Sequence, residues 1–532
     1  MHEEITSDYE IGQDNVTLFG LDVHNPVFMI SGLTIVAFVI LTLMFQAQAA
    51  EFFNWLRPAV TSTFDWFFIS SGNLFVLFAF VLVVTPLGSV RLGGADATPD
   101  YSYLGWFAML FAAGMGIGLM YFGVSEPISH FNSSMGGTAL EGGMRTDWAP
   151  LGAAAGDALA ARDLAMAATI YHWGLHPWAI YAVVGLSLAF FAFNYNLPLT
   201  LRSAFYPLLG ERVWGWPGHL IDVVAVFATL FGLATSLGFG TTQALAGFNF
   251  LYGWSTGEIA MVMLIGVITT IALISVVRGL DGGVKVLSEI NMGLALLLLL
   301  FIIIFGPTAE VFSTIGSGMV AYVKEFIPLS TPFGREDVNF SQGWTSFYWA
   351  WWVSWSPFVG MFIARVSRGR SVREFVICVI FIPTILCAIW MGAFGGTAIT
   401  QVIADAAAPV AAAAQEVKLF EMVKLFPLAG VLSLIGIVLV LVFFVTSSDS
   451  GSLVIDTITA GGKVDAPVPQ RVFWCIFEGL VAATLLLVGG DEALGALQAM
   501  AVSTGLPFTV VLLAMCVSLW IGLSKYRSLS KA

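Results

Sequence analysis

The stretch Ala113-Gly114-Met115-Gly116-Ile117-Gly118 interrupts an apolar run that extends from Tyr101 to Ser125. Glycine costs about 1 kcal/mol in a helix interior relative to alanine, so three alternating glycines are a poor basis for a regular helix. The pattern predicts a membrane-spanning helix that unwinds here and exposes backbone amides and carbonyls around a cavity or a bound ion. Close packing of two helices through small residues is the alternative interpretation.

The rest of the chain is apolar enough to lie in a lipid bilayer. Of its 532 residues, 58% are hydrophobic and only 10% are charged, which is too apolar for a soluble protein. Twelve stretches are long enough to cross a ~30 Å hydrocarbon core as helices of about 20 residues, and Glu478 is the one charged residue inside them. We therefore predict an all-α polytopic membrane protein with transmembrane helices at Val27–Gln46, Trp66–Val90, Tyr101–Ser125, Leu164–Leu201, Val223–Gly257, Ile259–Val277, Ile290–Ala309, Val338–Ala364, Phe375–Ala404, Leu425–Ser448, Val472–Gly490 and Ala493–Ser524.

Charged residues at the ends of these spans indicate the orientation of the chain. With the amino end inside, 14 of the 21 Lys and Arg residues lie on the cytoplasmic side, so the positive-inside rule places both termini in the cytoplasm of a bacterial-type inner membrane. The first apolar run follows an acidic tail without a basic start or a cleavage site, so we expect it to remain as a helix. The net charge of −13 gives no basis for binding nucleic acid.

Two spans differ from ordinary lipid-facing helices, and each would begin a set of five. They are Tyr101–Ser125, with its glycines, and Val338–Ala364, which is rich in tryptophan. Secondary transporters are often built from two such sets in opposite orientation. We therefore divide the chain into an amino tail (1–26), two peripheral helices (27–100), a first five-helix repeat (101–306), an interfacial helix and connection (307–337), a second five-helix repeat (338–524) and a short tail (525–532).

The segment between the two sets, Pro307–Phe326, has the pattern of a short amphipathic helix in the membrane interface. A continuation of the preceding span is the alternative. The apolar residues at helical spacing are Val311, Ile315, Met319, Tyr322 and Phe326.

Aromatic residues gather in two spans. Trp173, Trp178 and Tyr181 lie close together in one of them, where anchoring at the membrane interface is the alternative role. The other span has more tryptophan than an interfacial belt needs, at positions Trp344, Trp349, Trp351, Trp352 and Trp355. Clustered aromatic faces bind quaternary ammonium groups by cation–π attraction, worth about 0.5 to 2 kcal/mol per ring. Because the third and fourth spans contain no Asp or Glu, a zwitterionic substrate is favoured over a purely cationic one.

Two motifs resemble those of the betaine/choline/carnitine transporter (BCCT) family. They are Gly114-Met-Gly-Ile-Gly-Leu-Met-Tyr-Phe-Gly-Val-Ser-Glu-Pro127 and Trp344-Thr-Ser-Phe-Tyr-Trp-Ala-Trp-Trp-Val-Ser-Trp-Ser-Pro-Phe358, and the continuation from Gly360 to Phe375 fits as well. The resemblance covers nearly the whole chain and is closest to sodium-coupled transporters of glycine betaine or dimethylsulfoniopropionate. It implies the leucine-transporter fold with two inverted repeats, and a homotrimer that assembles through the interfacial helix.

The resemblance also implies the positions of the substrate site. A box around the methylated cation would be formed by Trp173, Trp178, Tyr181 and Trp352, and the pathway beside it by Trp351, Trp355 and Phe358. The substrate carboxylate would meet backbone amides near Met115 and Gly116. Family members that carry choline have an Asp where this chain has Gly118, so we expect choline to be a poor substrate.

A sodium site is a further implication of the resemblance, with Thr446 and Ser447 joined by backbone carbonyls near Ala112, Met115 and Phe443. Oxygen ligands suit a hard cation such as sodium. Taken alone, however, a Thr-Ser pair near a helix end is more often bonded to its own backbone.

A second sodium site in similar proteins uses two threonines one turn apart. Thr229 matches the first, but Leu233 stands at the second, so only Thr229 remains for such a site. Sodium-independent relatives place an arginine in the membrane instead of the ion. Between Arg212 and Arg278 this chain has no basic residue, which favours coupling to sodium.

From these observations we expect a sodium symporter for a zwitterionic quaternary ammonium or tertiary sulfonium compound, with the sodium ion as coupling ion and no other cofactor. One alternative is a sodium-independent exchanger of carnitine-type betaines. Another, from a different class, is a membrane receptor that binds onium compounds without moving them. An enzyme is not expected, because no nucleophile–base or metal motif is present, and His172 and His176 are expected to be packed or hydrogen-bonded.

Overall fold

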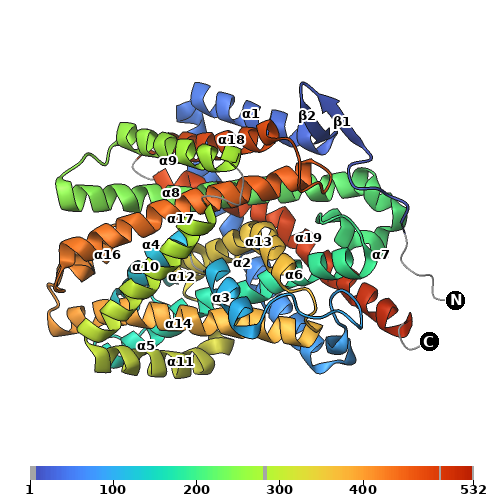
Figure 1. Ribbon diagram of the computed structural model, residues 1–532. Helices are drawn as coiled ribbons and strands as arrows, with labels where there is room; N and C mark the ends of the chain where they lie inside the picture. Colours follow the sequence, from blue (N-terminus) through green and yellow to red (C-terminus); the bar gives the residue numbers. More distant parts are fainter. Residues whose placement is uncertain (1–6, 115, 279–283, 491–492, 530–532) are drawn as a thin grey trace.

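Helices make up most of the computed structural model, which describes residues 7–114, 116–278, 284–490 and 493–529. Within those ranges the strands form two small antiparallel hairpins, β1 (Asn15–Leu18) with β2 (Leu21–His24) and β3 (Leu140–Glu141) with β4 (Met144–Arg145). The prediction of an all-α polytopic membrane protein is confirmed (Figure 1).

The helices vary from single turns to 39 residues. In chain order they are α1 (Val27–Met44), α2 (Gln46–Val84), η1 (Pro86–Ser89), α3 (Tyr103–Gly114), α4 (Ile117–Gly136), α5 (Ala158–Trp173), α6 (Leu175–Tyr195), η2 (Arg202–Phe205), α7 (Tyr206–Leu209), η3 (Gly210–Trp214), α8 (Trp216–Tyr252), α9 (Glu258–Arg278), α10 (Val284–Phe305), α11 (Thr308–Ser330), α12 (Val338–Phe340), η4 (Ser341–Thr345), α13 (Ser346–Val366), α14 (Val372–Ala404), α15 (Pro409–Ala412), α16 (Lys418–Val423), α17 (Ala429–Thr459), α18 (Val468–Gly489) and α19 (Ala493–Leu529).

Ten helical stretches in the described residues are long and apolar enough to cross a membrane, and they correspond to ten of the twelve predicted spans. The other two are Tyr101–Ser125 and Val338–Ala364. The first is divided into α3 and α4, and the second consists of the short α12, a turn of π-helix, η4, and then α13. The two spans that carry the glycine and tryptophan patterns are thus irregular, and the fourth predicted span is also divided, into α5 and α6 at Gly174.

The tryptophan-rich helix α13 lies inside the molecule, packed between α2, α6, α8 and α19 (Figure 1). Every side chain from Ser346 to Pro357 is buried, so this helix has no lipid-facing side over three turns. At the periphery the apolar side chains of α9 and α10 remain open, with Ile259 78% and Ile304 63% exposed, as expected where lipid is the solvent. The tryptophans of α13 therefore pack in the interior of the protein and do not form an interfacial belt.

The predicted amphipathic helix is present as α11, and a break at Pro307 separates it from α10. It packs along α5 and α14, at the lower edge of the view (Figure 1). Val311 and Tyr322 of the predicted apolar stripe are buried in this contact. Val320 and Val323 point away from it and are 70% and 73% exposed. The helix therefore has one apolar face against the protein and a second that is open.

Loop contacts agree with the predicted division of the loops between two sides. Arg91 donates to the carbonyl of Gly369 (2.7 Å), and both belong to loops predicted to be cytoplasmic. Arg57, predicted to lie in an outer loop, donates to the carbonyl of Gly343 (3.1 Å), near the outer end of the predicted span Val338–Ala364. The β1–β2 hairpin and the end of α19 lie at the same end of the molecule (Figure 1).

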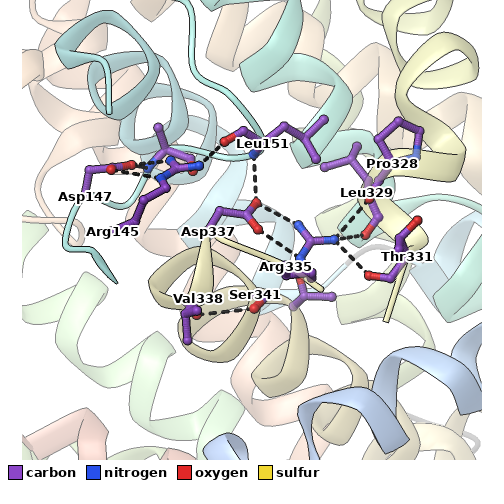
Figure 2. A network of polar contacts seen from close by, with 12 residues as sticks. Arg145, Asp147, Leu151, Pro328, Leu329, Thr331, Arg335, Asp337, Val338 and Ser341 are labelled. Carbon is purple, nitrogen blue, oxygen red and sulfur yellow. Dashed lines mark hydrogen bonds and ion pairs between the residues drawn. The ribbon is translucent and has the colours of Figure 1, made fainter. Parts of the chain in front are cut away.

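A network of charged residues connects the loop after α4 with the end of α11 and the start of α12 (Figure 2). Asp337 accepts a hydrogen bond from the backbone of Leu151 (2.7 Å) and pairs with Arg335 (2.7 Å), whose guanidinium also donates to carbonyls at the end of α11. In the same loop, hydrogen bonds from Arg145 hold the pKa of Asp147 at about 2, so this pair stays ionised at physiological pH. The network anchors the segment that leads into α13.

Candidate functional site

The glycine stretch is the point at which α3 ends and α4 begins. The first helix ends at Gly114, the second begins at Ile117, and Gly116 between them is extended, with φ −166° and ψ −172°. Met115, predicted to offer backbone atoms to the substrate and to sodium, lies outside the described residues. The predicted interruption of this span is confirmed, and Gly116 lines a pocket at the amino end of α4.

Aromatic rings from α5, α6 and α13 form the wall of this pocket. The rings of Trp173 and Trp352 meet edge to face at 4.9 Å. Tyr181 lies 6.1 Å from Trp352 and 5.3 Å from Trp178, while Trp351 stacks on Trp352 at 4.8 Å. The structure therefore brings together the four aromatic residues predicted for the box, and Gly118 and Trp355 also line the pocket.

The tryptophans of α13 are held by hydrogen bonds from their indole nitrogens. Trp352 donates to the carbonyl of His172 (2.9 Å), and Trp351 and Trp355 donate to groups of α8 (3.2 and 3.0 Å). Phe358, predicted to lie beside the pathway, packs on Trp355 at 5.4 Å and is not part of the pocket wall. With their N–H groups engaged elsewhere, these rings offer the pocket mainly apolar, electron-rich surface, which suits a cation with a methylated exterior.

Glu126 is a residue of this site that the sequence analysis missed. The expectation that the third and fourth spans contain no carboxylate is wrong, because α4 continues beyond Ser125 to Gly136 and Glu126 is fully buried within it. Its carboxylate accepts hydrogen bonds from the indole of Trp173 (2.7 Å) and from the hydroxyl of Tyr348. The signal was present as the Glu-Pro pair of the first motif, but the charge itself was taken as the end of the span.

Two histidines complete the surroundings of Glu126. Its Oε1 lies 2.6 Å from Nδ1 of His172 and 3.3 Å from Nε2 of His130, and Nε2 of His172 lies 2.9 Å from the hydroxyl of Thr345. The three side chains are of types that bind divalent metals, and their ligand atoms lie within 4.8 Å of one another. Here each histidine is hydrogen-bonded to the carboxylate, as expected for His172, and the three side chains form a network. His176 makes a separate stacking contact with a tryptophan of α13.

The residues predicted to bind sodium lie on two helices with different neighbours. Thr446 and Ser447 are in α17, where the hydroxyl of Thr446 donates to the carbonyls of Val442 (3.0 Å) and Phe443 (3.2 Å). The proton of that hydroxyl is thus used within the helix, while its oxygen keeps lone pairs for a ligand. Ala112 is in α3, which packs against α13 and α14, whereas α17 packs against α8 and α18. Sodium binding by this set stays a prediction.

At the second predicted sodium position, Leu233 stands where similar proteins have a second threonine hydroxyl. Thr229 is fully buried in α8 and donates to the carbonyl of Ala225 (2.7 Å). One turn later, Leu233 packs against α17 so closely that a Cβ on Gly451 would lie 2.3 Å from its Cδ1. The contact between α8 and α17 therefore leaves Thr229 without a second threonine one turn away.

Comparisons with known proteins show the family to which this chain is similar. The sequence profile described as BCCT, betaine/carnitine/choline family transporter, matches residues 26–528. A Vibrio parahaemolyticus protein named as a glycine betaine/proline/choline transporter is 64% identical over 99% of this chain and 95% of its own. A second protein of that species, named glycine betaine transporter 1, is 55% identical over 98% of both chains.

More distant proteins are similar as well. A glycine betaine transporter of Acinetobacter baylyi is 40% identical over 92% of this chain and 72% of its own. Among solved structures, a histidine-to-alanine mutant of the manganese transporter of Eremococcus coleocola aligns over 81% of this chain and 87% of its own, at 13% identity. Its TM-score of 0.42 is too low to support a statement about the fold.

Proposed function

Because this chain belongs to the betaine/carnitine/choline transporter family, we propose that it is a sodium-coupled symporter that imports a zwitterionic onium compound through its aromatic pocket. Members of this family are transporters, so the chain is a membrane transporter and not an enzyme. The observation that carries the substrate proposal is the pocket itself, in which Trp173, Trp178, Tyr181 and Trp352 surround a space without a charged wall residue among those described.

Glycine betaine is the first candidate substrate, because four relatives between 40% and 64% identical are named for it. Dimethylsulfoniopropionate is a second candidate, since trimethylammonium and dimethylsulfonium groups present similar cationic surfaces to aromatic faces. The relative at 64% identity is also named for choline. Choline therefore joins the candidates, although Gly118 led us to expect it to be a poor substrate.

Sodium coupling is supported by the oxygen atoms of Thr446 and Ser447 and by the interruption of the span at Gly116. In the proposed cycle sodium organises the broken helix, the amides near Gly116 receive the substrate carboxylate, and the aromatic pocket takes the onium group. A membrane potential of 100 mV contributes about 2.3 kcal/mol per charge moved, or nearly fiftyfold of accumulation, before the sodium gradient is counted.

We further propose that the transporter works in a bacterial inner membrane, with both termini in the cytoplasm, and assembles as a homotrimer. The charge distribution of the loops supports the orientation. The open apolar face of α11, with Val320 and Val323 exposed, supports an additional contact with lipid or with a neighbouring subunit.

Uptake of labelled glycine betaine into proteoliposomes tests the coupling. We expect uptake with an inward sodium gradient and little with potassium in its place. In Thr446→Val, the sodium concentration for half-maximal uptake should rise by about tenfold or more, because a ligand oxygen is removed. The matched control is Thr457→Val on the same helix, whose hydroxyl donates to the carbonyl of Leu453 (2.8 Å). Uptake that needs no sodium and is stimulated by substrate on the opposite side would instead identify an exchanger.

A further inference from the structure

The pocket wall is uncharged, but a carboxylate lies directly behind it. Among the residues that the structure describes, no Asp, Glu, Lys or Arg lines the pocket. Glu126 has none of its surface exposed and accepts a hydrogen bond from the indole N–H of Trp173 (2.7 Å), whose ring forms part of the wall. It also accepts from Tyr348, whose ring stacks on that of Trp352 at 5.8 Å. One buried acid thus contacts two of the rings that form or support the box.

The neighbours of Glu126 are those of an ionised carboxylate. Oε2 receives the N–H of Trp173, which can only donate, and the O–H of Tyr348. Oε1 faces a ring nitrogen of His172 (2.6 Å) and one of His130 (3.3 Å), each of which can donate. Both histidines can supply N–H donors, and together with the two donors at Oε2 they stabilise the charged form of Glu126. A negative charge is therefore held at a fixed place beside the pocket.

We propose that Glu126 sets the preference of the pocket between purely cationic and zwitterionic substrates. In the low-dielectric interior, its charge attracts an onium group on the other side of the Trp173 ring. A zwitterion gains less from this, because the same charge repels its carboxylate and the two effects largely cancel. Choline has the attraction alone. This inference rests on the proposed function, since it requires that the pocket bind onium compounds.

The test compares the dissociation constants of choline and glycine betaine for the purified full-length protein and for Glu126→Gln, which keeps the shape but removes the charge. We expect the variant to lose about tenfold more affinity for choline than for glycine betaine. Glu478→Gln is the matched control. Glu478 is also fully buried, but it lies in α18 and is hydrogen-bonded to Ser452 (3.2 Å), so its loss should leave the ratio of the two constants unchanged.

A purely structural role would give a different result, because a distorted pocket would weaken both ligands by the same factor. If Glu126→Gln leaves the ratio of the choline and glycine betaine dissociation constants unchanged, the inference is overturned while the proposed function stays intact. If the unmodified protein binds neither ligand, the proposed function fails and the inference fails with it. If Glu126→Gln does not fold, Glu126→Asp and Glu126→Asn are compared instead. Their side chains are equally short and differ in charge, so the ratio of the two dissociation constants again tests the inference.

Discussion

Trp352→Ala is expected to weaken glycine betaine binding by about thirtyfold or more and to reduce uptake at low substrate concentration to background. The ring of Trp352 lies 4.9 Å from that of Trp173 and 6.1 Å from that of Tyr181, so its loss opens the box on the side of α13. One cation–π contact is worth up to about 2 kcal/mol, which is about thirtyfold in Kd. A tryptophan fluorescence titration measures Kd, and uptake into proteoliposomes measures transport.

Two milder variants separate recognition from stability, because Trp→Ala in a core also costs about 3–5 kcal/mol of stability. Trp352→Phe keeps an aromatic face but loses the hydrogen bond to His172, and should bind with intermediate affinity. Trp349→Phe changes another buried tryptophan of the same helix, one that stacks on His176 at 5.1 Å, and this variant should bind as the unmodified protein does. Affinity within threefold of normal in Trp352→Ala would show that this ring does not bind the substrate.

Gly118→Ala is expected to reduce glycine betaine uptake by more than tenfold. A Cβ at this position would lie 2.8 Å from Cη2 of Trp173 and 3.0 Å from Cη2 of Trp351, so even one methyl group forces two rings of the pocket to move. The glycine is thus required for the close approach of α4 to the aromatic cluster. An aspartate at the same position would need a larger displacement of both rings. Uptake and the tryptophan emission spectrum together report the change.

Gly136→Ala is the matched control for that variant. Gly136 lies in the same helix, and a Cβ there would meet no atom within 4 Å. Its uptake should equal that of the unmodified protein. If Gly118→Ala transports normally and its tryptophan emission is unchanged, the rings of Trp173 and Trp351 are not packed against α4 as described.

The irregular parts of the fold could be predicted because their residues depart from what a lipid-facing helix needs. Alternating glycines disfavour a continuous helix, and α3 does end at Gly114. Tryptophans spread over three turns cannot all lie at headgroup level, and those of α13 are buried. The same departures explain why these two spans fall outside the ten that length and hydropathy identify.

Glu126 could not be assigned from the sequence because its partners are distant along the chain. Trp173 lies 47 residues away and Tyr348 lies 222 residues away, so the hydrogen bonds that make a buried carboxylate tolerable depend on the tertiary fold. A hydropathy rule ends a span at the first charge, whereas a satisfied carboxylate can stay inside one. The contact of Leu233 with Gly451 is likewise a tertiary feature, although the missing second threonine was evident from the sequence.

The most direct test of cation recognition by the aromatic pocket is a comparison of the dissociation constants of two ligands of nearly the same shape. Glycine betaine and tert-butylacetate differ in that a neutral carbon replaces the positively charged nitrogen. Both are titrated into the purified protein, and Kd is read from tryptophan fluorescence. We expect tert-butylacetate to bind at least tenfold more weakly, because cation–π attraction is lost while shape is retained. Equal affinity for the two ligands would contradict recognition of the cation by these rings.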